Sequence, residues 1–327
     1  MKTLAEKIKP YFKLLRVSNL AFLAILLYVI EKWVAVPLLQ QQQFSELVPW
    51  WVLMLLIISV VCVAAGGYVI NDYFDVKIDR INHPDDIVVT RVISREGAMS
   101  WFYVLTAIGI VAGLAVAWWA KSWNLLFIYV VIPGLLWFYS SSYKRMLLVG
   151  NLMVAFVSAL VPLLVAIVNA DYLRALYHEA LAYTPIVGQL YVWLGGFSLF
   201  CFLLTLAREI VKDMEDIEGD REMECRTMPI VCSEKVSKAV VSTIVLIIMA
   251  LICYLAWFVM PFPIEWSTLT CRFIIFGLMV PMLCVLVLLW AAHSKRELHT
   301  VQQVIKLVMF LGTMFSYVIY TNLIVTP

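Results

Sequence analysis

Charged residues are scarce in this chain, at 14% of its 327 residues, whereas a soluble globular domain carries about 25%. Apolar residues make up 64%, and the mean hydropathy is +0.94. This composition excludes a soluble globular domain, a disordered chain and a coiled coil. It also excludes an outer-membrane barrel, whose strands alternate in polarity over only about ten residues. We therefore predict an all-α polytopic protein of the lipid bilayer, with no nucleic-acid partner.

Cysteine is sparse as well. The number of cysteines, seven, is odd, and five of them lie inside or at the edge of apolar segments, where cysteine usually serves as a small packing residue. Cys225 and Cys232 share a polar loop but have no histidine near them in the sequence. These counts exclude a disulfide scaffold and give no metal-binding pattern of cysteine and histidine.

Uncharged apolar segments long enough to cross a bilayer recur along the chain. A helix needs roughly 20 residues to do so. Eight segments qualify: 47–71, 97–120, 122–143, 146–170, 180–207, 239–264, 273–294 and 307–327. A ninth is expected near 17–38, although Glu31 and Lys32 interrupt it. A cleaved signal peptide is the alternative there, but the segment starts late and has no convincing small-residue cleavage site.

The basic residues predict how these nine helices are oriented. Twenty of the 24 Lys and Arg residues then lie on the same side as the N-terminus, and the other side has Lys32, Lys121, Arg174 and Arg272. Short loops rich in Lys and Arg stay in the cytoplasm. We therefore expect an integral protein of the cytoplasmic (inner) membrane, with its N-terminus in the cytoplasm and its C-terminus outside.

Two acidic segments, 71–79 and 213–220, lie at expected cytoplasmic helix ends and share one spacing. Positions i, i+3 and i+7 of a helix lie within roughly 60° of arc. Each helix end should therefore present a stripe of three carboxylates. The repetition suggests a single domain over 1–327 with two four-helix-like halves. The two trios are Asp72, Asp75 and Asp79, and Asp213, Asp216 and Asp220.

Such a stripe needs positive charge nearby, because a carboxylate at the edge of the membrane is costly when unpaired and three on one face repel one another. Lys77 and Lys212 lie off the stripes. Mg²⁺ prefers oxygen ligands, and it takes one or two carboxylates together with water and phosphate oxygens. We therefore predict Mg²⁺ as the cofactor and the six aspartates as its ligands and as the catalytic residues.

The alternative is that both acidic segments are ordinary solvated residues just outside the membrane. That interpretation suits Glu215, Glu218, Glu222 and Glu224, which lie off the second stripe or beyond it. Glu215 in particular should point away from the aspartates. For the aspartates themselves, the identical spacing at two matching helix ends favours a functional role.

Several segments resemble conserved motifs of the UbiA superfamily of intramembrane prenyltransferases. NDYFDVKIDRINHP at 71–84 resembles the first aspartate-rich motif, and KDMEDIEGD at 212–220 resembles the second. Shorter matches are RVSN at 16–19, YSSSYKR at 139–145 followed by GN at 150–151, and RTMP at 226–229. The resemblance covers essentially the whole chain. It implies a ring of nine helices around a central lipid-accessible cavity, with the two motifs facing each other under cytoplasmic cap loops.

The resemblance also implies an activity, the transfer of an isoprenyl group from a prenyl diphosphate to a lipophilic acceptor. Two Mg²⁺ ions would bridge the aspartates to the diphosphate and stabilise its negative charge as it departs. An apolar cavity would keep water from the allylic cation. Basic side chains should complete the charge balance, although a role in membrane orientation explains them equally well. The implied substrate-binding residues are Asn19, Tyr68, Asn71, Arg91, Tyr139, Lys144, Arg145, Asn151, Glu209 and Arg226.

One departure concerns the segment after the first motif. Many family members have an Arg-Pro pair where this chain has Asp86-Ile87. A positive contact to the diphosphate is therefore missing at its usual place, and Arg91 or Arg95 is expected to supply it.

The acceptor is less defined than the donor. The segment REIVKDMEDIEGD at 208–220 is most similar to the branch that transfers geranylgeranyl to geranylgeranylglyceryl phosphate. An aromatic quinone precursor is the alternative acceptor. An ion-coupled transporter is a further alternative, but transporters usually place such residues near the bilayer midplane. The Asp-Gly and Ala-Arg signature of CDP-alcohol phosphotransferases is absent from the sequence.

Overall fold

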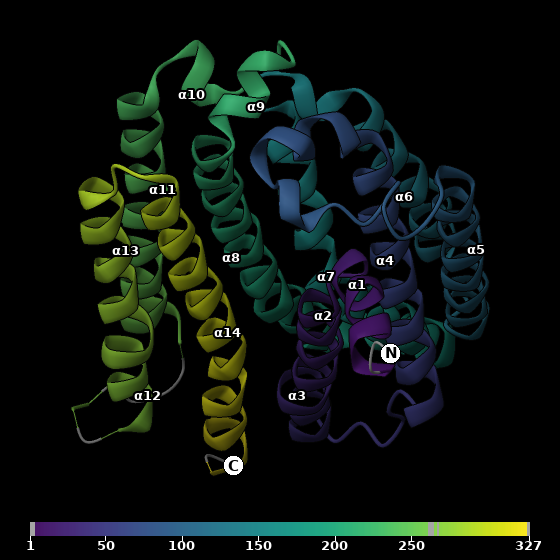
Figure 1. Ribbon diagram of the computed structural model, residues 1–327. Coiled ribbons are helices and arrows are strands. Elements are labelled where there is room, and N and C mark those ends of the chain that lie inside the picture. Colours follow the sequence, from purple (N-terminus) through teal and green to yellow (C-terminus); the bar gives the residue numbers. More distant parts are fainter. Residues whose placement is uncertain (1–3, 261–264, 267, 326–327) are drawn as a thin grey trace. The chain divides into compact units, whose positions relative to one another are not determined.

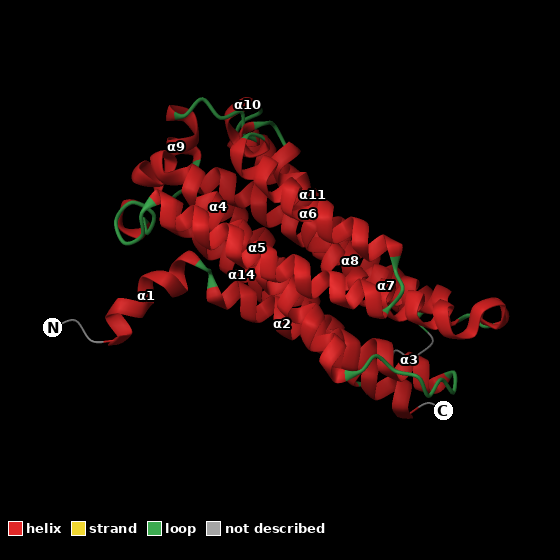
Figure 2. Ribbon diagram, turned by 90° about the vertical axis from the view of Figure 1, so that its right-hand side faces the viewer, coloured by secondary structure: helices red, strands yellow, loops and turns green. Residues whose placement is uncertain are grey.

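The computed structural model describes residues 4–260, 265–266 and 268–325, and these residues are almost entirely helical. Figure 2 shows helices joined by short loops. Within the described part of the chain, the one bridge of the β type joins Val89 to Ile93 in a loop. The structure confirms the all-α prediction.

Nine helical segments of the described residues are long and apolar enough to cross a membrane. Each covers most of one predicted span, including the first, so the expected number is confirmed for this part of the chain. The ends of the expected spans at 261–264 and 326–327 lie outside the described residues. The nine segments are Val17–Gln41, Trp50–Asn82, Arg95–Trp119, Trp123–Ser141, Val149–Tyr183, Ile186–Glu215, Glu234–Val259, Leu269–Ala291 and Lys295–Ile324.

Short helical pieces interrupt or flank these spans. The first span consists of α2 (Val17–Ile30), a π-helical turn at Glu31–Ala35 and α3 (Val36–Gln41). A short helix, α1 (Leu4–Leu14), precedes it. The remaining helices are α4 (Trp50–Asn82), α5 (Arg95–Trp119), α6 (Trp123–Ser141), α7 (Val149–Tyr177), α8 (Ile186–Glu215), α9 (Ile217–Glu222), α10 (Met228–Val231), α11 (Glu234–Tyr254), α12 (Leu269–Arg272), α13 (Val280–Ala291) and α14 (Lys295–Val325).

The chain divides into two compact units, each of which is described by itself. Unit 1 comprises Met1–Tyr28, Glu46–Arg145 and Leu164–Pro185. Unit 2 comprises Val29–Ser45, Met146–Leu163 and Ile186–Pro327. The first acidic segment belongs to unit 1, and the second belongs to unit 2.

In unit 1, small residues let α4 and α5 pack closely (Figure 1). A Cβ atom built on Gly109 would lie 2.9 Å from the carbonyl oxygen of Ser59, and one built on Gly113 would lie 2.7 Å from the Ser59 hydroxyl oxygen. The Ser59 hydroxyl donates to the Gly109 carbonyl at 2.7 Å. Small residues and interhelical hydrogen bonds are the usual means of helix association in lipid, because burial of apolar surface adds little there.

Beneath the first acidic segment, apolar side chains form a buried core. Val69, Ile70 and Val76 of α4 pack with Val88 and Val89 of the loop that follows the helix. Leu14, Ala98 and Phe102 complete this core. The C-terminal end of α4 therefore packs against this core, which holds its polar residues in place.

Unit 2 contains the long helices α8, α11, α13 and α14, which pack against one another (Figure 1). The Ser198 hydroxyl of α8 donates to the carbonyl of Ala159 in α7. Near the other end of α14, Asn322 donates to the hydroxyl of Thr270 at 3.0 Å. Hydrogen bonds between helices thus tie unit 2 together as well.

Candidate functional site

The first aspartate trio lies on a single continuous helix. Asp72, Asp75 and Asp79 belong to α4, which runs without interruption to Asn82. All three side chains are partly buried, whereas Lys77 on the same turn is exposed. The structure therefore confirms one stripe of carboxylates on this helix, with Lys77 off it.

Arg16 provides positive charge at the first carboxylate of the trio. Its Nη2 atom donates to Oδ1 of Asp72 at 3.1 Å. The guanidinium also lies over the ring of Tyr68, 4.9 Å from the ring centroid. Tyr68 is one helical turn before Asp72 on α4. This places the predicted residue Tyr68 beside the trio. Sequence reasoning counted Arg16 only as an orientation charge, although its place in the RVSN match was a signal that could have identified it.

Lys144 provides positive charge at the second carboxylate. It lies in the short helical turn Tyr143–Arg145 after α6 and forms an ion pair with Asp75. The exposed fractions of the two side chains are only 11% and 13%. Two cations thus compensate two of the three carboxylates, which answers the electrostatic need that the sequence indicated.

The other predicted residues of unit 1 vary in exposure. Asn71 is buried beside Asp72, and Asn19 and Tyr139 are partly buried. Arg91 and Arg145 are exposed. The guanidinium of Arg95 lies over the ring of Tyr73, 5.5 Å from the centroid. The side chain of Asp86 lies outside the described residues.

The second trio is not on one continuous helix, and the expectation of a single stripe is wrong there. Helix α8 ends at Glu215, and Asp216 is the residue between α8 and α9. Asp213 therefore lies in the last turn of α8 and Asp220 in α9. Backbone hydrogen bonds still span the break, from Asp216 to the Lys212 carbonyl at 2.9 Å and from Asp220 to the Asp216 carbonyl at 3.1 Å.

An uncharged side chain contacts the first aspartate of the second trio. Nδ2 of Asn151, in α7, donates to Oδ2 of Asp213 at 2.8 Å. This places Asn151, another predicted substrate-binding residue, directly on a predicted metal ligand. Glu209 is buried one turn earlier on α8 and pairs with Arg208. Arg226 is exposed in the loop that follows α9.

Glu215 contradicts the expectation that it is a solvated residue. Only 8% of Glu215 is exposed, and both of its carboxylate oxygens have partners on α14. By contrast, Glu218, Glu222 and Glu224 are exposed, as expected. The helical angle of Glu215 does separate it from the aspartates, but a neighbouring helix buries it, and helical periodicity alone cannot predict that neighbour.

The donor set suits a hard cation that binds together with a phosphate ligand. The carboxylates of both acidic segments offer oxygen ligands, which Mg²⁺ prefers. Among the described residues, no three His, Cys, Asp or Glu side chains are close enough to hold a metal ion by themselves. Mg²⁺ usually needs only one or two carboxylates and fills its other positions with water and substrate phosphate. The assignment of Asp72, Asp75, Asp79, Asp213, Asp216 and Asp220 as its ligands stays a prediction from the sequence.

The described residues thus define an all-α integral membrane protein with acidic motifs at two helix ends. Residues 41–314 match the model of the UbiA prenyltransferase family. This chain belongs to the UbiA prenyltransferase family, and it is an enzyme that transfers prenyl groups.

Two curated relatives of this chain carry the same name. A digeranylgeranylglyceryl phosphate synthase of Sulfurisphaera tokodaii is 32% identical over 261 residues, which are 77% of this chain and 79% of the relative. The enzyme of the same name from Methanobrevibacter smithii is 29% identical over 245 residues, 74% of this chain and 76% of the relative.

Solved structures share the fold. One, from work on digeranylgeranylglyceryl phosphate synthase in membranes, has a TM-score of 0.59 at 23% identity and covers 95% of this chain and 99% of that one. A UbiA homolog from Archaeoglobus fulgidus bound to DMAPP and Mg²⁺ has a TM-score of 0.58 at 15% identity, with the same coverage. At these identities the likeness establishes the fold.

Proposed function

We propose that this enzyme transfers an isoprenyl group from a prenyl diphosphate to geranylgeranylglyceryl phosphate, with Mg²⁺ bound by the two aspartate trios. The observation that carries the proposal is the pair of trios with one spacing, the first of them compensated by Arg16 and Lys144. The names of the relatives support this acceptor. The A. fulgidus homolog, with its bound DMAPP and Mg²⁺, supports the donor class and the metal.

The chemistry follows from the charges. The bond between the allylic carbon and the diphosphate oxygen breaks, a bond from that carbon to an acceptor hydroxyl oxygen forms, and diphosphate and a proton are released. When bound, Mg²⁺ acts as a Lewis acid on the departing diphosphate. Lys144 is nearly buried and fixed by Asp75, so its ammonium is held in advance where the diphosphate charge would develop. Arg16 would serve in the same way beside Asp72.

The direct test uses purified protein and labelled donors. Geranylgeranyl diphosphate should be incubated with geranylgeranylglyceryl phosphate, and separately with an aromatic quinone precursor such as 4-hydroxybenzoate. We expect an ether product that keeps the phosphate. Prenylation of the aromatic acceptor alone would replace our proposal with the quinone-precursor alternative. Shorter prenyl diphosphates in parallel would define the donor length.

We also propose that both acidic segments face the cytoplasm, on the evidence of the basic residues. Cys232 offers a native probe because it is exposed, whereas Cys225 in the same loop is buried. In a variant that keeps only Cys232, an impermeant maleimide should label inverted membrane vesicles but not intact cells. Arg91→Cys, introduced as the single cysteine, should give the same labelling for the loop after α4. Opposite labelling of the two loops would contradict a shared diphosphate. The expected position of residue 327 outside the cell concerns a residue that is not among the described ones.

A further inference from the structure

Glu215 is a buried carboxylate at the joint between α8 and α9. Its Oε2 accepts a hydrogen bond from Nε2 of Gln302 at 2.5 Å, and its Oε1 lies 3.2 Å from Nδ1 of His299. Both partners come from α14, at positions three residues apart on one face. A buried carboxylate without such partners would be costly, so these contacts fix the end of α8 on α14.

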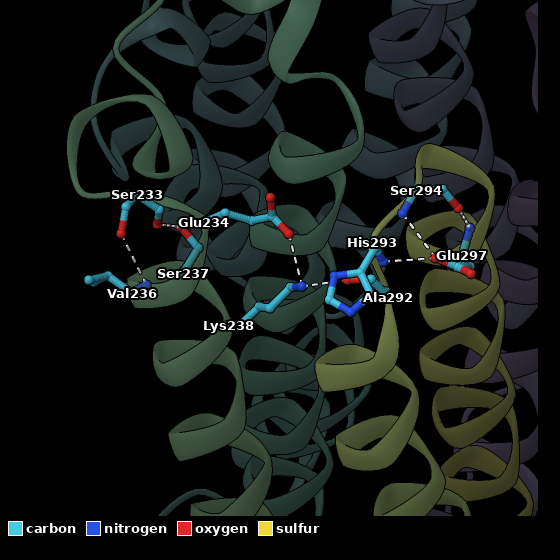
Figure 3. A network of polar contacts seen from close by, with 9 residues as sticks. All are labelled: Ser233, Glu234, Val236, Ser237, Lys238, Ala292, His293, Ser294 and Glu297. Carbon is cyan, nitrogen blue, oxygen red and sulfur yellow. Dashed lines mark hydrogen bonds and ion pairs between the residues drawn. The ribbon is translucent and has the colours of Figure 1, made fainter.

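The first turn of α14 is itself held firmly. The Glu297 carboxylate accepts from the backbone N–H groups of His293 at 2.7 Å and Ser294 at 2.9 Å, while Ser294 Oγ accepts from the Glu297 N–H at 3.4 Å. This reciprocal arrangement is a capping box, which satisfies backbone groups at the start of a helix. Figure 3 shows these residues together.

Helix α11 anchors the same turn. Lys238 is buried, and its Nζ atom donates to the Ala292 carbonyl at 2.5 Å and pairs with Oε1 of Glu234 at 2.9 Å (Figure 3). Because Ala292 lies just before the capping box, Lys238 ties the start of α14 to α11. His299 and Gln302 lie within the next two turns of α14, and the first turn of this helix is therefore held in place by the capping box and by Lys238.

The joint between α8 and α9 determines where two predicted metal ligands point. Asp213 is two residues before Glu215 and Asp216 is the residue after it, at the break itself. Asn151 of α7 holds the side chain of Asp213. The contacts of Glu215 with α14 fix the residue directly before Asp216, at the same break.

We propose that Glu215 is a positioning residue for the second acidic motif. Its attachment to Gln302 and His299 holds the α8–α9 joint so that Asp213 and Asp216 present their carboxylates to Mg²⁺. Both oxygens of Glu215 contact side chains of α14, and we therefore assign Glu215 to positioning and not to the metal. This inference rests on the proposed function, since it assigns Glu215 a role at that metal site.

A purely structural role for Glu215 predicts a different result. Substitution of an anchor would lower the melting temperature of the protein and leave the affinity of the folded protein for metal unchanged. Substitution of a positioning residue weakens metal binding in protein that is still folded. Residues that orient metal ligands typically contribute about 10- to 100-fold to metal affinity.

The experiment measures Mn²⁺ binding by electron paramagnetic resonance on the purified full-length protein, with and without geranyl thiolodiphosphate, which resists ionisation. We expect Glu215→Ala to weaken Mn²⁺ binding about 10-fold or more, within that range. Glu215→Gln should weaken it less, because its amide oxygen can still accept one hydrogen bond. Glu218→Ala is the matched control, since Glu218 is exposed three residues away and should behave like the wild type.

An exchanged pair keeps the test valid if Glu215→Ala fails to fold. Gln302→Glu alone places a second carboxylate against that of Glu215 and should weaken Mn²⁺ binding. Gln302→Glu combined with Glu215→Gln restores one donor and one acceptor at this contact, and Mn²⁺ binding should recover. Melting curves are recorded for every variant. Wild-type Mn²⁺ affinity in folded Glu215→Ala, or in Gln302→Glu, would overturn the positioning role.

Asp213→Ala distinguishes failure of the positioning role of Glu215 from failure of the proposed function. If Asp213→Ala abolishes Mn²⁺ binding while the Glu215 variants bind normally, the positioning role fails and the proposed function stands. If Asp213→Ala binds Mn²⁺ as the wild type does, the proposed metal site itself fails, and the role of Glu215 fails with it.

Discussion

The two acidic segments have the same spacing but different surroundings. On α4, the trio lies on one uninterrupted helix, and cations contact two of its members: Arg16 at Asp72 and Lys144 at Asp75. At the end of α8 the helix breaks within the trio, and the amide of Asn151 contacts Asp213.

This difference shows that spacing alone does not define a carboxylate's role. A cation beside a carboxylate lowers the negative charge of the site and can also contact an anionic ligand. A neutral amide orients a carboxylate without removing its charge. We infer that the first segment contributes more to holding diphosphate and the second more to holding metal. The predictions below test that division.

The largest effects are expected from the aspartates that open the two trios. Asp72→Ala and Asp213→Ala should each lower the transfer rate by at least about 10²-fold, the scale of losing one preorganised electrostatic group. EDTA should abolish transfer, and Mg²⁺ should restore it. Steady-state assays with labelled donor measure both effects. Activity that persists in chelator after removal of both aspartates would refute metal dependence.

Lys144→Ala should have the next largest effect and should act on the donor. A charge-assisted hydrogen bond contributes roughly 1.5 to 3 kcal/mol, so donor kcat/KM should fall roughly 10- to 100-fold while acceptor KM changes little. Lys77→Ala is the matched control because Lys77 lies on α4 but is exposed and off the stripe. Equal losses in the two variants would indicate a general charge effect and not a contact at Asp75.

Asn151→Ala should have a smaller effect, and on the metal. Loss of its single hydrogen bond to Asp213 should cost about 1 kcal/mol, which corresponds to a roughly fivefold higher Mg²⁺ concentration at half-maximal rate. Donor KM at saturating Mg²⁺ should stay near the wild-type value. A change confined to donor KM would place Asn151 on the diphosphate and would break the proposed division between the segments.

Arg91→Ala should have the smallest effect. If Arg91 replaces the cation missing at Asp86-Ile87, donor KM should rise. Exposed ion pairs contribute only about 0.2 to 1 kcal/mol, so the rise should be about fivefold at most. Arg95→Ala serves for comparison, because Arg95 lies over Tyr73. Unchanged donor KM and kcat in Arg91→Ala would leave Lys144 as the better candidate and Arg91 as an orientation charge.

Sequence reasoning recovered the features that depend on composition and local spacing. The lengths of the apolar segments predicted nine spans, and the described part of the chain contains nine. Helical periodicity placed Asp72, Asp75 and Asp79 on one face of α4 and left Lys77 off it, because α4 continues through that segment. The aspartate motifs also identified the family that the comparisons show.

Only the tertiary structure decided which groups compensate the carboxylates. Arg16 and Lys144 are 56 and 69 positions away from their aspartates in the chain, and Gln302 is 87 positions from Glu215. Periodicity assigns a side chain to a face of its own helix, but it does not say which other helix covers that face. Glu215 was therefore expected in solvent and is buried on α14. Charge compensation of a buried group depends on distances in space, which the local pattern of a sequence does not contain.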